Sequence, residues 1–204
     1  MILVIRAGKV TVYPGFLLLF AVFYFFDPGW LIPAAAVSVT IHELGHIATL
    51  FIMGIPINAV NLSMTGIAIK IDGRLIGYRG EIIAALSGPC ASIILSLGAT
   101  YAARAVNCEF LYILSGMSAV HGIFNLLPIR PLDGGRAAQA ILYSALGRRY
   151  GERSLELIEV ALIFLLTATG FWLYFFRVQN MTFLIIPLWI SFYYCKQNMN
   201  SVEF

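Results

Sequence analysis

The sequence carries little charge for its length. Only 11% of its 204 residues are charged, whereas soluble domains carry about a quarter. Hydrophobic residues make up 60% of the chain, and the mean hydropathy is +0.88. This composition excludes an ordinary soluble domain and predicts a protein that crosses a lipid bilayer several times. The 13 lysines and arginines form no basic run with interleaved aromatic residues, so we expect no nucleic-acid partner.

Cysteine is equally scarce. The chain has three cysteines, at positions 90, 108 and 195, and none of them forms a C-x-x-C pair. An odd number at scattered positions excludes a disulfide framework and a thiolate zinc site as interpretations of the pattern. We therefore expect any metal to be held by nitrogen and oxygen ligands.

Histidine is also rare, but two of the three histidines lie in one pentapeptide, HELGH, within an apolar run of helical length. Residues four apart in a helix lie on the same face, one turn apart. His42 and His46 can thus direct imidazole nitrogens at one cation, with Glu43 on the neighbouring face. This H-E-x-x-H arrangement predicts two zinc ligands and a carboxylate that takes a proton from metal-bound water, whose pKa zinc lowers toward about 7.

A chance match is the alternative to be weighed for HELGH. Three ionisable side chains within five residues of an apolar, membrane-length run would each cost several kcal/mol if they had no partner. Ionisable residues inside a membrane segment are therefore candidates for function by default. The setting favours the metal site over coincidence.

The third zinc ligand is expected to be a carboxylate. A catalytic zinc takes three protein ligands and keeps one position open, and His121 is the only other histidine. Asp133, in the segment PLDGG, follows an apolar run that Pro128 and Pro131 terminate. From local sequence, an N-cap for a helix starting at Gly135 explains this aspartate equally well.

The order of apolar runs predicts an all-α polytopic membrane protein with six transmembrane helices and a small β-sheet at the membrane surface. The sheet comprises an N-terminal strand or hairpin within residues 1–13 and residues 57–78, where Asp72-Gly73 indicates a hairpin turn. A polar stretch is expected over 136–153, and the whole chain, 1–204, is interpreted as one domain. The expected spans are residues 14–30, 31–55, 81–103, 110–127, 156–176 and 181–195.

Basic residues are distributed unequally between the two sides that six spans define. Arg104 and Arg177 fall on one side, and the other eleven lysines and arginines fall on the opposite side. The positive-inside rule then places both termini in the cytoplasm, as for a multi-pass protein of a bacterial-type cytoplasmic membrane. The expected site opens toward the cytosol.

Three motifs occur in order in this chain: HELGH, SGP at 87–89 and NLLPIRPLDGG at 125–135. Together they resemble the site-2 protease family of intramembrane zinc metalloproteases. The short six-span layout is similar to the sporulation branch, whose type member is stage IV sporulation protein FB. The resemblance covers about residues 10–150 and implies zinc held by His42, His46 and Asp133, with Glu43 as the general base.

The resemblance also implies a role for Asn125, which would hold substrate or the oxyanion. An interhelical hydrogen bond is the alternative for this amide. His121, one turn earlier, is interpreted either as a group that supports the site or as a core histidine bonded to a backbone carbonyl. The family often has SGPxxN, and this chain has Ser92 where that Asn falls. A PDZ module and a CBS domain are not expected within the 204 residues.

The function implied is hydrolysis of a membrane-embedded or membrane-tethered protein near the cytoplasmic face. A sporulation sigma-factor precursor is the substrate that the branch suggests, with the lipid bilayer and inhibitory membrane proteins as further partners. Two alternatives stay open: an inactive relative that acts as a scaffold, and a zinc transporter. A transporter would be expected to show an internal repeat, which the sequence lacks.

Overall fold

The computed structural model describes residues 5–7, 10–12, 29–63, 66–71 and 76–175. Within them the chain forms helices and one sheet. The expected spans 14–30 and 181–195 lie outside the described residues, apart from positions 29 and 30. The described helices are α2 (Leu31–Ile52), α3 (Tyr78–Val106), α4 (Glu109–Asn125) and α5 (Asp133–Leu173).

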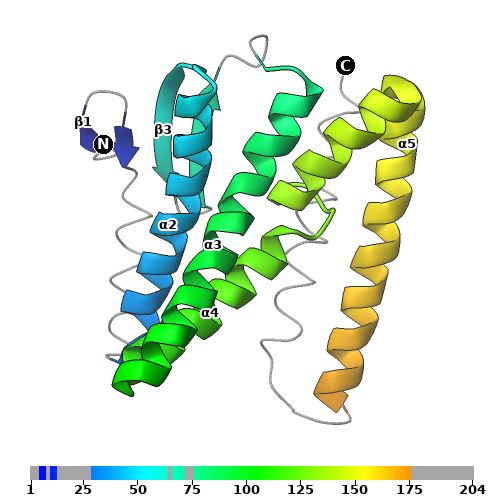
Figure 1. Cartoon of the computed structure of the whole chain (residues 1–204). Coiled ribbons are helices and arrows are strands. Elements are labelled where there is room, and N and C mark those ends of the chain that lie inside the picture. The colour runs from blue at the N-terminus through cyan, green and yellow to red at the C-terminus, as the bar shows by residue number, and fades with distance from the viewer. Residues whose placement is uncertain (1–4, 8–9, 13–28, 64–65, 72–75, 176–204) are drawn as a thin grey trace.

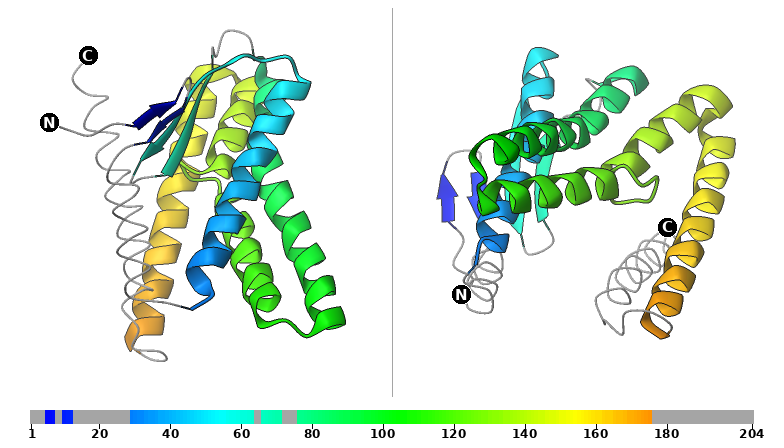
Figure 2. Two further views of the ribbon diagram at one scale, coloured as in Figure 1. Left: turned by 90° about the vertical axis from the view of Figure 1, so that its left-hand side faces the viewer. Right: turned by 60° about the horizontal axis from the view of Figure 1, so that its bottom comes forward.

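Helix α3 lies at the centre of the arrangement and packs against α2, α4 and α5 (Figures 1 and 2). Its buried positions are small: Ala84, Ala85, Gly88, Ser92, Ser96, Ala99 and Ala103, with Pro89 among them. Small side chains let helix backbones approach closely, which is how helices associate where the surroundings are as apolar as the side chains. The SGP segment therefore lies in the contact between α2 and α3.

Large apolar side chains point outward instead. Phe51 is 81% exposed, Tyr101 80% and Phe164 74%, and they lie on α2, α3 and α5. These three helices are long and apolar enough to cross a membrane, and the 17-residue α4 is shorter. Small residues inside and large apolar residues outside form the distribution expected of a protein in lipid. The structure thus shows a mostly helical chain with three candidate spans among the described residues.

Helix α5 changes direction at Gly147, whose φ of 75° and ψ of 163° interrupt the helix (Figure 1). A positive φ is unfavourable for residues that have a Cβ, so glycine suits this position. We call residues 133–146 the first arm of α5 and residues 148–173 the second arm. The polar stretch expected over 136–153 is helical on both sides of this break, and the second arm contains most of the span expected at 156–176.

A four-stranded sheet of order β1-β2-β3-β4 lies beside α2. Strands β1 (Ile5–Ala7) and β2 (Val10–Val12) are antiparallel, β2 is parallel to β3 (Ile57–Ser63), and β3 is antiparallel to β4 (Gly66–Ile71). The turn expected at Asp72-Gly73 lies outside the described residues. The pairing of Ser63 with Gly66 shows a reversal between β3 and β4 that was not predicted from the sequence. Residue 78 belongs to α3, and the position of the sheet at a membrane surface stays a prediction.

Candidate metal centre

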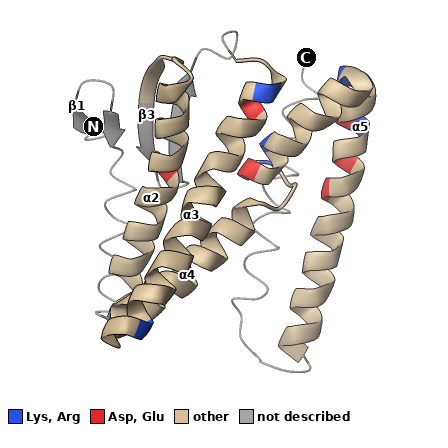
Figure 3. Cartoon of the chain, in the orientation of Figure 1, with Lys and Arg blue, Asp and Glu red and all other residues tan. Residues whose placement is uncertain are grey.

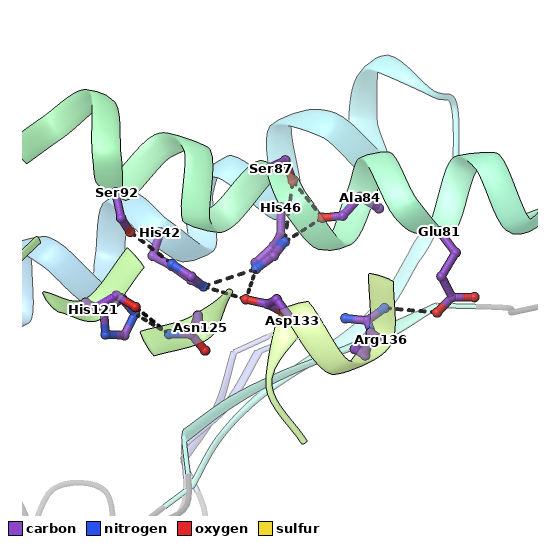
Figure 4. Close-up of polar contacts among 10 residues, drawn as sticks. All are labelled: His42, His46, Glu81, Ala84, Ser87, Ser92, His121, Asn125, Asp133 and Arg136. Carbon is purple, nitrogen blue, oxygen red and sulfur yellow. Dashed lines mark hydrogen bonds and ion pairs between the residues drawn. The ribbon is translucent and has the colours of Figure 1, made fainter. Parts of the chain in front are cut away.

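Three side chains from two distant parts of the chain meet beside α3 (Figure 4). His42 and His46 lie on the buried face of α2, and Asp133 is the first residue of α5. Asp133 Oδ2 lies 2.9 Å from His42 Nε2 and 3.2 Å from His46 Nε2, and the two Nε2 atoms are 3.3 Å apart. Among the described residues, these three form the group of histidine, cysteine and acidic side chains that could hold a metal ion.

The triangle of donor atoms has the size that zinc requires. Zinc–nitrogen and zinc–oxygen bonds of about 2.0–2.1 Å in a tetrahedron place neighbouring ligand atoms about 3.3 Å apart. The observed separations of 2.9, 3.2 and 3.3 Å are close to this value. Two imidazoles and one carboxylate also match the ligand chemistry of a catalytic zinc with one open position. The residues present therefore fit a zinc ion.

The ring of His46 is fixed by its second nitrogen. His46 Nδ1 lies 2.7 Å from the backbone oxygen of Ala84, and a carbonyl can only accept, so Nδ1 donates. The neutral ring then presents a lone pair on Nε2 toward Asp133, which also offers lone pairs. Such converging acceptors favour a cation between them. The hydroxyl of Ser87, from the SGP segment, donates to the same Ala84 oxygen at 2.7 Å.

The ring of His42 is fixed in a similar way, by a side chain whose role the sequence did not reveal. Its Nδ1 lies 3.0 Å from the hydroxyl of Ser92, which is fully buried on α3. Ser92 stands where the resembling family often has an asparagine. A serine and an asparagine can each hydrogen-bond an imidazole. The presence of a polar residue at position 92 was therefore the one sequence feature that could have indicated a partner for His42. The ring of His121, on α4, meets the His42 ring edge-on at 4.5 Å between centroids.

Gly88, the central residue of SGP, lets both imidazoles approach α3. A Cβ at this position would overlap His46 Nε2 and lie 2.8 Å from His42 Nε2. Gly45, inside HELGH, faces α3 from the other side, and a Cβ there would lie 2.7 Å from the backbone oxygen of Ser87. These two glycines allow α2 and α3 to pack at the distance that the histidines need.

Glu43 is half-buried on α2, beside the two histidines in sequence. The ionisable side chains around its carboxylate include those of His46, His42 and Asp133. The structure places it near the donor triangle without making it one of the three donors. This is the position expected of a base that acts beside a metal.

The Asp133 carboxylate contacts the two histidines of α2 and does not cap its own helix. The N-cap of α5 is Leu132, which makes no side-chain cap bond, and Asp133 Oδ2 lies 2.9 Å from His42 Nε2 and 3.2 Å from His46 Nε2. The N-cap interpretation of Asp133 is therefore wrong: its contacts with α2 replace the local backbone bonds that a cap would make. Gly134 and Gly135 pack against the backbone of Leu126 and Ile129, where a Cβ would overlap other atoms.

Asn125 and His121 lie one turn apart on α4, next to the donor triangle (Figure 4). The amide nitrogen of Asn125 donates to the backbone oxygen of His121 at 3.0 Å and lies 3.4 Å from its Nε2. The structure thus brings the candidate residues together, and the role of each of them stays a prediction.

The model of peptidase family M50 matches residues 83–168 of this chain. The match includes SGP and NLLPIRPLDGG, and it begins after HELGH. A zinc metalloprotease of Methanocaldococcus jannaschii is 32% identical over 120 residues, which are 56% of this chain and 34% of that protein. The chain spans about a third of the length of this relative and of a second curated one, the putative zinc metalloprotease Rip3 of Mycobacterium tuberculosis.

A solved structure, the site-2 protease from Methanocaldococcus jannaschii, resembles this chain over most of its length. Its TM-score is 0.66 and its sequence identity 23%, and the superposition covers 94% of this chain and 93% of the other. At this identity the likeness concerns the fold. The family model and the curated relative support peptidase family M50 for this chain, the solved structure shows the same fold, and none of these comparisons distinguishes the sporulation branch.

Proposed function

We infer that this chain is a zinc metalloprotease of peptidase family M50 that hydrolyses peptide bonds within or beside a membrane. The observation that carries this proposal is the triangle of His42, His46 and Asp133. The two histidines lie, with Glu43, in the second half of the candidate membrane span α2. The M50 match and the zinc metalloprotease relative support the same activity.

The side chains around the triangle have distinct tasks. Zinc, when bound, supplies a Lewis acid that makes water acidic enough to serve as a nucleophile near neutral pH. Glu43 accepts the proton of the attacking water and passes it to the leaving amine. Ala84 and Ser92 keep the imidazoles oriented through their Nδ1 atoms. Asn125 can turn one amide hydrogen toward the oxyanion while the other stays bonded to His121.

The substrate is proposed to be a membrane-embedded or membrane-tethered protein that is cut near the cytoplasmic face. Most of the charged residues lie toward the end of the bundle that holds the start of α3 and the break in α5 (Figure 3). Arg104 lies near the opposite end of α3. This asymmetry supports a cytoplasmic position for the charged end, and with it cytoplasmic termini for a six-span chain.

A sporulation sigma-factor precursor and inhibitory membrane partners are finer proposals, which rest on the motif resemblance alone. Zinc transport and a scaffold role are weaker alternatives. The intact Glu43 favours hydrolysis over a scaffold, since a carboxylate that holds no metal in this apolar position has a function in proton transfer.

The test compares the wild type with Glu43→Gln in detergent. We expect both proteins to bind about one zinc per chain, because Glu43 is not one of the three donors, and we expect only the wild type to cut a model membrane-tethered protein. Zinc bound by both proteins with equal cleavage would remove Glu43 as the base. Absence of bound zinc from both would overturn the proposed activity.

A further inference from the structure

Arg130, three residues before Asp133, lies in a dense network of charged hydrogen bonds to the second arm of α5. Its backbone nitrogen and its Nε both donate to Glu159 Oε1 at 2.8 Å, and its NH2 donates to Glu159 Oε2 at 2.7 Å. Its NH1 donates to Glu152 Oε1 at 2.8 Å. The hydrogen bonds that Arg130 donates to Glu159 raise the pKa of Arg130 further above its ordinary value, so the guanidinium stays charged.

The network is too deeply buried to be an ordinary surface ion pair. Glu159 is completely buried and the Arg130 side chain is 14% exposed. Taking two charges out of water is costly, and such a pair often stabilises a protein no more than apolar side chains would. Its contribution here is geometric. A planar guanidinium that donates from three nitrogens to two carboxylates fixes the position and the orientation of the Arg130 segment relative to the second arm.

Further contacts hold the residues between Arg130 and the metal centre. Ile129 and Leu132, which flank Arg130, are buried against the second arm at Leu162, Ile163 and Leu166. The backbone of Ile129 and Arg130 in turn lies against Gly135, where a Cβ would be 2.5–2.7 Å from their atoms. The segment that carries Asp133 is therefore held to the second arm of α5 on both sides of Arg130, and has no regular structure of its own before residue 133.

We propose that Arg130 and Glu159 are positioning residues that hold Asp133 in place as the third metal ligand. The proposal rests on the proposed function, because it takes the donor triangle to be a zinc site. The two histidines need no such device, since the regular geometry of α2 spaces them. Asp133 lies on a different segment, and the bonds from Arg130 to Glu159 fix where that segment ends.

The test is the affinity for zinc, measured by competition with a chromophoric chelator in detergent. Glu159→Gln should weaken zinc binding about tenfold, the lower end of what groups behind metal ligands contribute. Glu156→Gln is the matched control, because it makes the same chemical change on the same arm at a half-buried carboxylate outside the Arg130 network. Equal affinity in wild type and Glu159→Gln would overturn the proposal.

A second variant separates positioning from stability. Glu159→Gln leaves the Arg130 charge without its main partner and can fail to fold, whereas Arg130→Leu with Glu159→Leu removes both charges and keeps apolar contact with the second arm. We expect the double variant to unfold at a temperature near that of the wild type and still bind zinc about tenfold more weakly. The visible spectrum of its Co²⁺ form should also change, since the carboxylate ligand is displaced.

The outcomes also separate this proposal from the proposed function. Wild-type affinity and a wild-type Co²⁺ spectrum in a well-folded double variant would show that the pair is merely structural, with the protease site intact. A wild-type protein that binds neither Zn²⁺ nor Co²⁺ would overturn the metal site itself. Arg130→Lys, which keeps the charge but loses the planar fork, should give an intermediate affinity.

Discussion

The metal centre combines two regions that are built differently. On α2, one turn of regular helix sets the spacing of His42 and His46, and contacts with α3 set only the rotation of their rings. At the start of α5, Asp133 follows a segment without regular structure, whose position depends on partners in the second arm. A helix can thus supply two ligands from local geometry, whereas a ligand from another segment needs tertiary contacts to hold it.

The strongest test of this comparison removes one donor from each region. Asp133→Ala and His46→Ala should each weaken zinc binding more than a hundredfold, because loss of a group behind a ligand already costs about 10–100-fold. Chelator competition measures the effect, and circular dichroism shows that the helices persist. If Asp133→Ala kept the wild-type affinity, the site would consist of the helical pair alone, and the comparison would fail.

The sequence predicted the two regions unequally well, for the same reason. The HELGH periodicity alone indicated which side chains share a face, and the structure brings them together. At Asp133, local sequence left a ligand and an N-cap equally open, since the decisive contacts come from residues about 90 positions earlier. The family resemblance favoured the ligand, and the structure places the carboxylate against both histidines.

Other features depended on tertiary contacts and were missed in the same way. Ser92 is recognisable as a partner of His42 only once α2 and α3 are packed. In the sequence, Glu159 is simply a charged residue near one end of an apolar run. Its hydrogen bonds with Arg130 connect residues 29 positions apart and are visible only in the structure. The reversal between Ser63 and Gly66 was likewise not predicted from the sequence, and it is visible only in the pairing of β3 with β4.

The close contact between α2 and α3 can be tested by adding a single methyl group at Gly88. Gly88→Ala should weaken zinc binding about tenfold to a hundredfold, because the new Cβ overlaps the imidazoles and overpacking of this kind costs about 1–3 kcal/mol. Gly98→Ala is the control on the same helix, where a Cβ meets nothing within 4 Å. The control should keep its zinc affinity and gain about 0.5–1 kcal/mol of stability. Equal zinc affinity in both variants would mean that α2 and α3 have room to separate.

The hydrogen bond behind His42 should have a smaller effect. Ser92→Ala removes the partner of Nδ1 and should weaken zinc binding about tenfold, with the overall helix content unchanged. Ser96→Ala, one turn further along α3, removes a buried hydroxyl that lies 3.3 Å from Ser115 and should leave the affinity unchanged. Isothermal titration with zinc compares them. A Ser92→Ala protein with full affinity would mean that helix geometry alone orients His42.

The smallest effect is expected at an ion pair that resembles the Arg130 network only in composition. Arg136, three residues after Asp133, pairs with Glu81 at 3.4 Å, and the two side chains are 44% and 37% exposed. An exposed pair of this kind contributes about 0–1 kcal/mol, because water and salt screen the charges and both side chains lose freedom. Glu81→Gln should therefore change the free energy of unfolding by less than about 1 kcal/mol, and zinc affinity by less than about twofold. Thermal unfolding at low and high salt, with parallel chelator competition, measures both quantities. A tenfold loss of zinc affinity would show that the exposed side of the Asp133 segment also holds the ligand, so that burial would not be what distinguishes the Arg130 network.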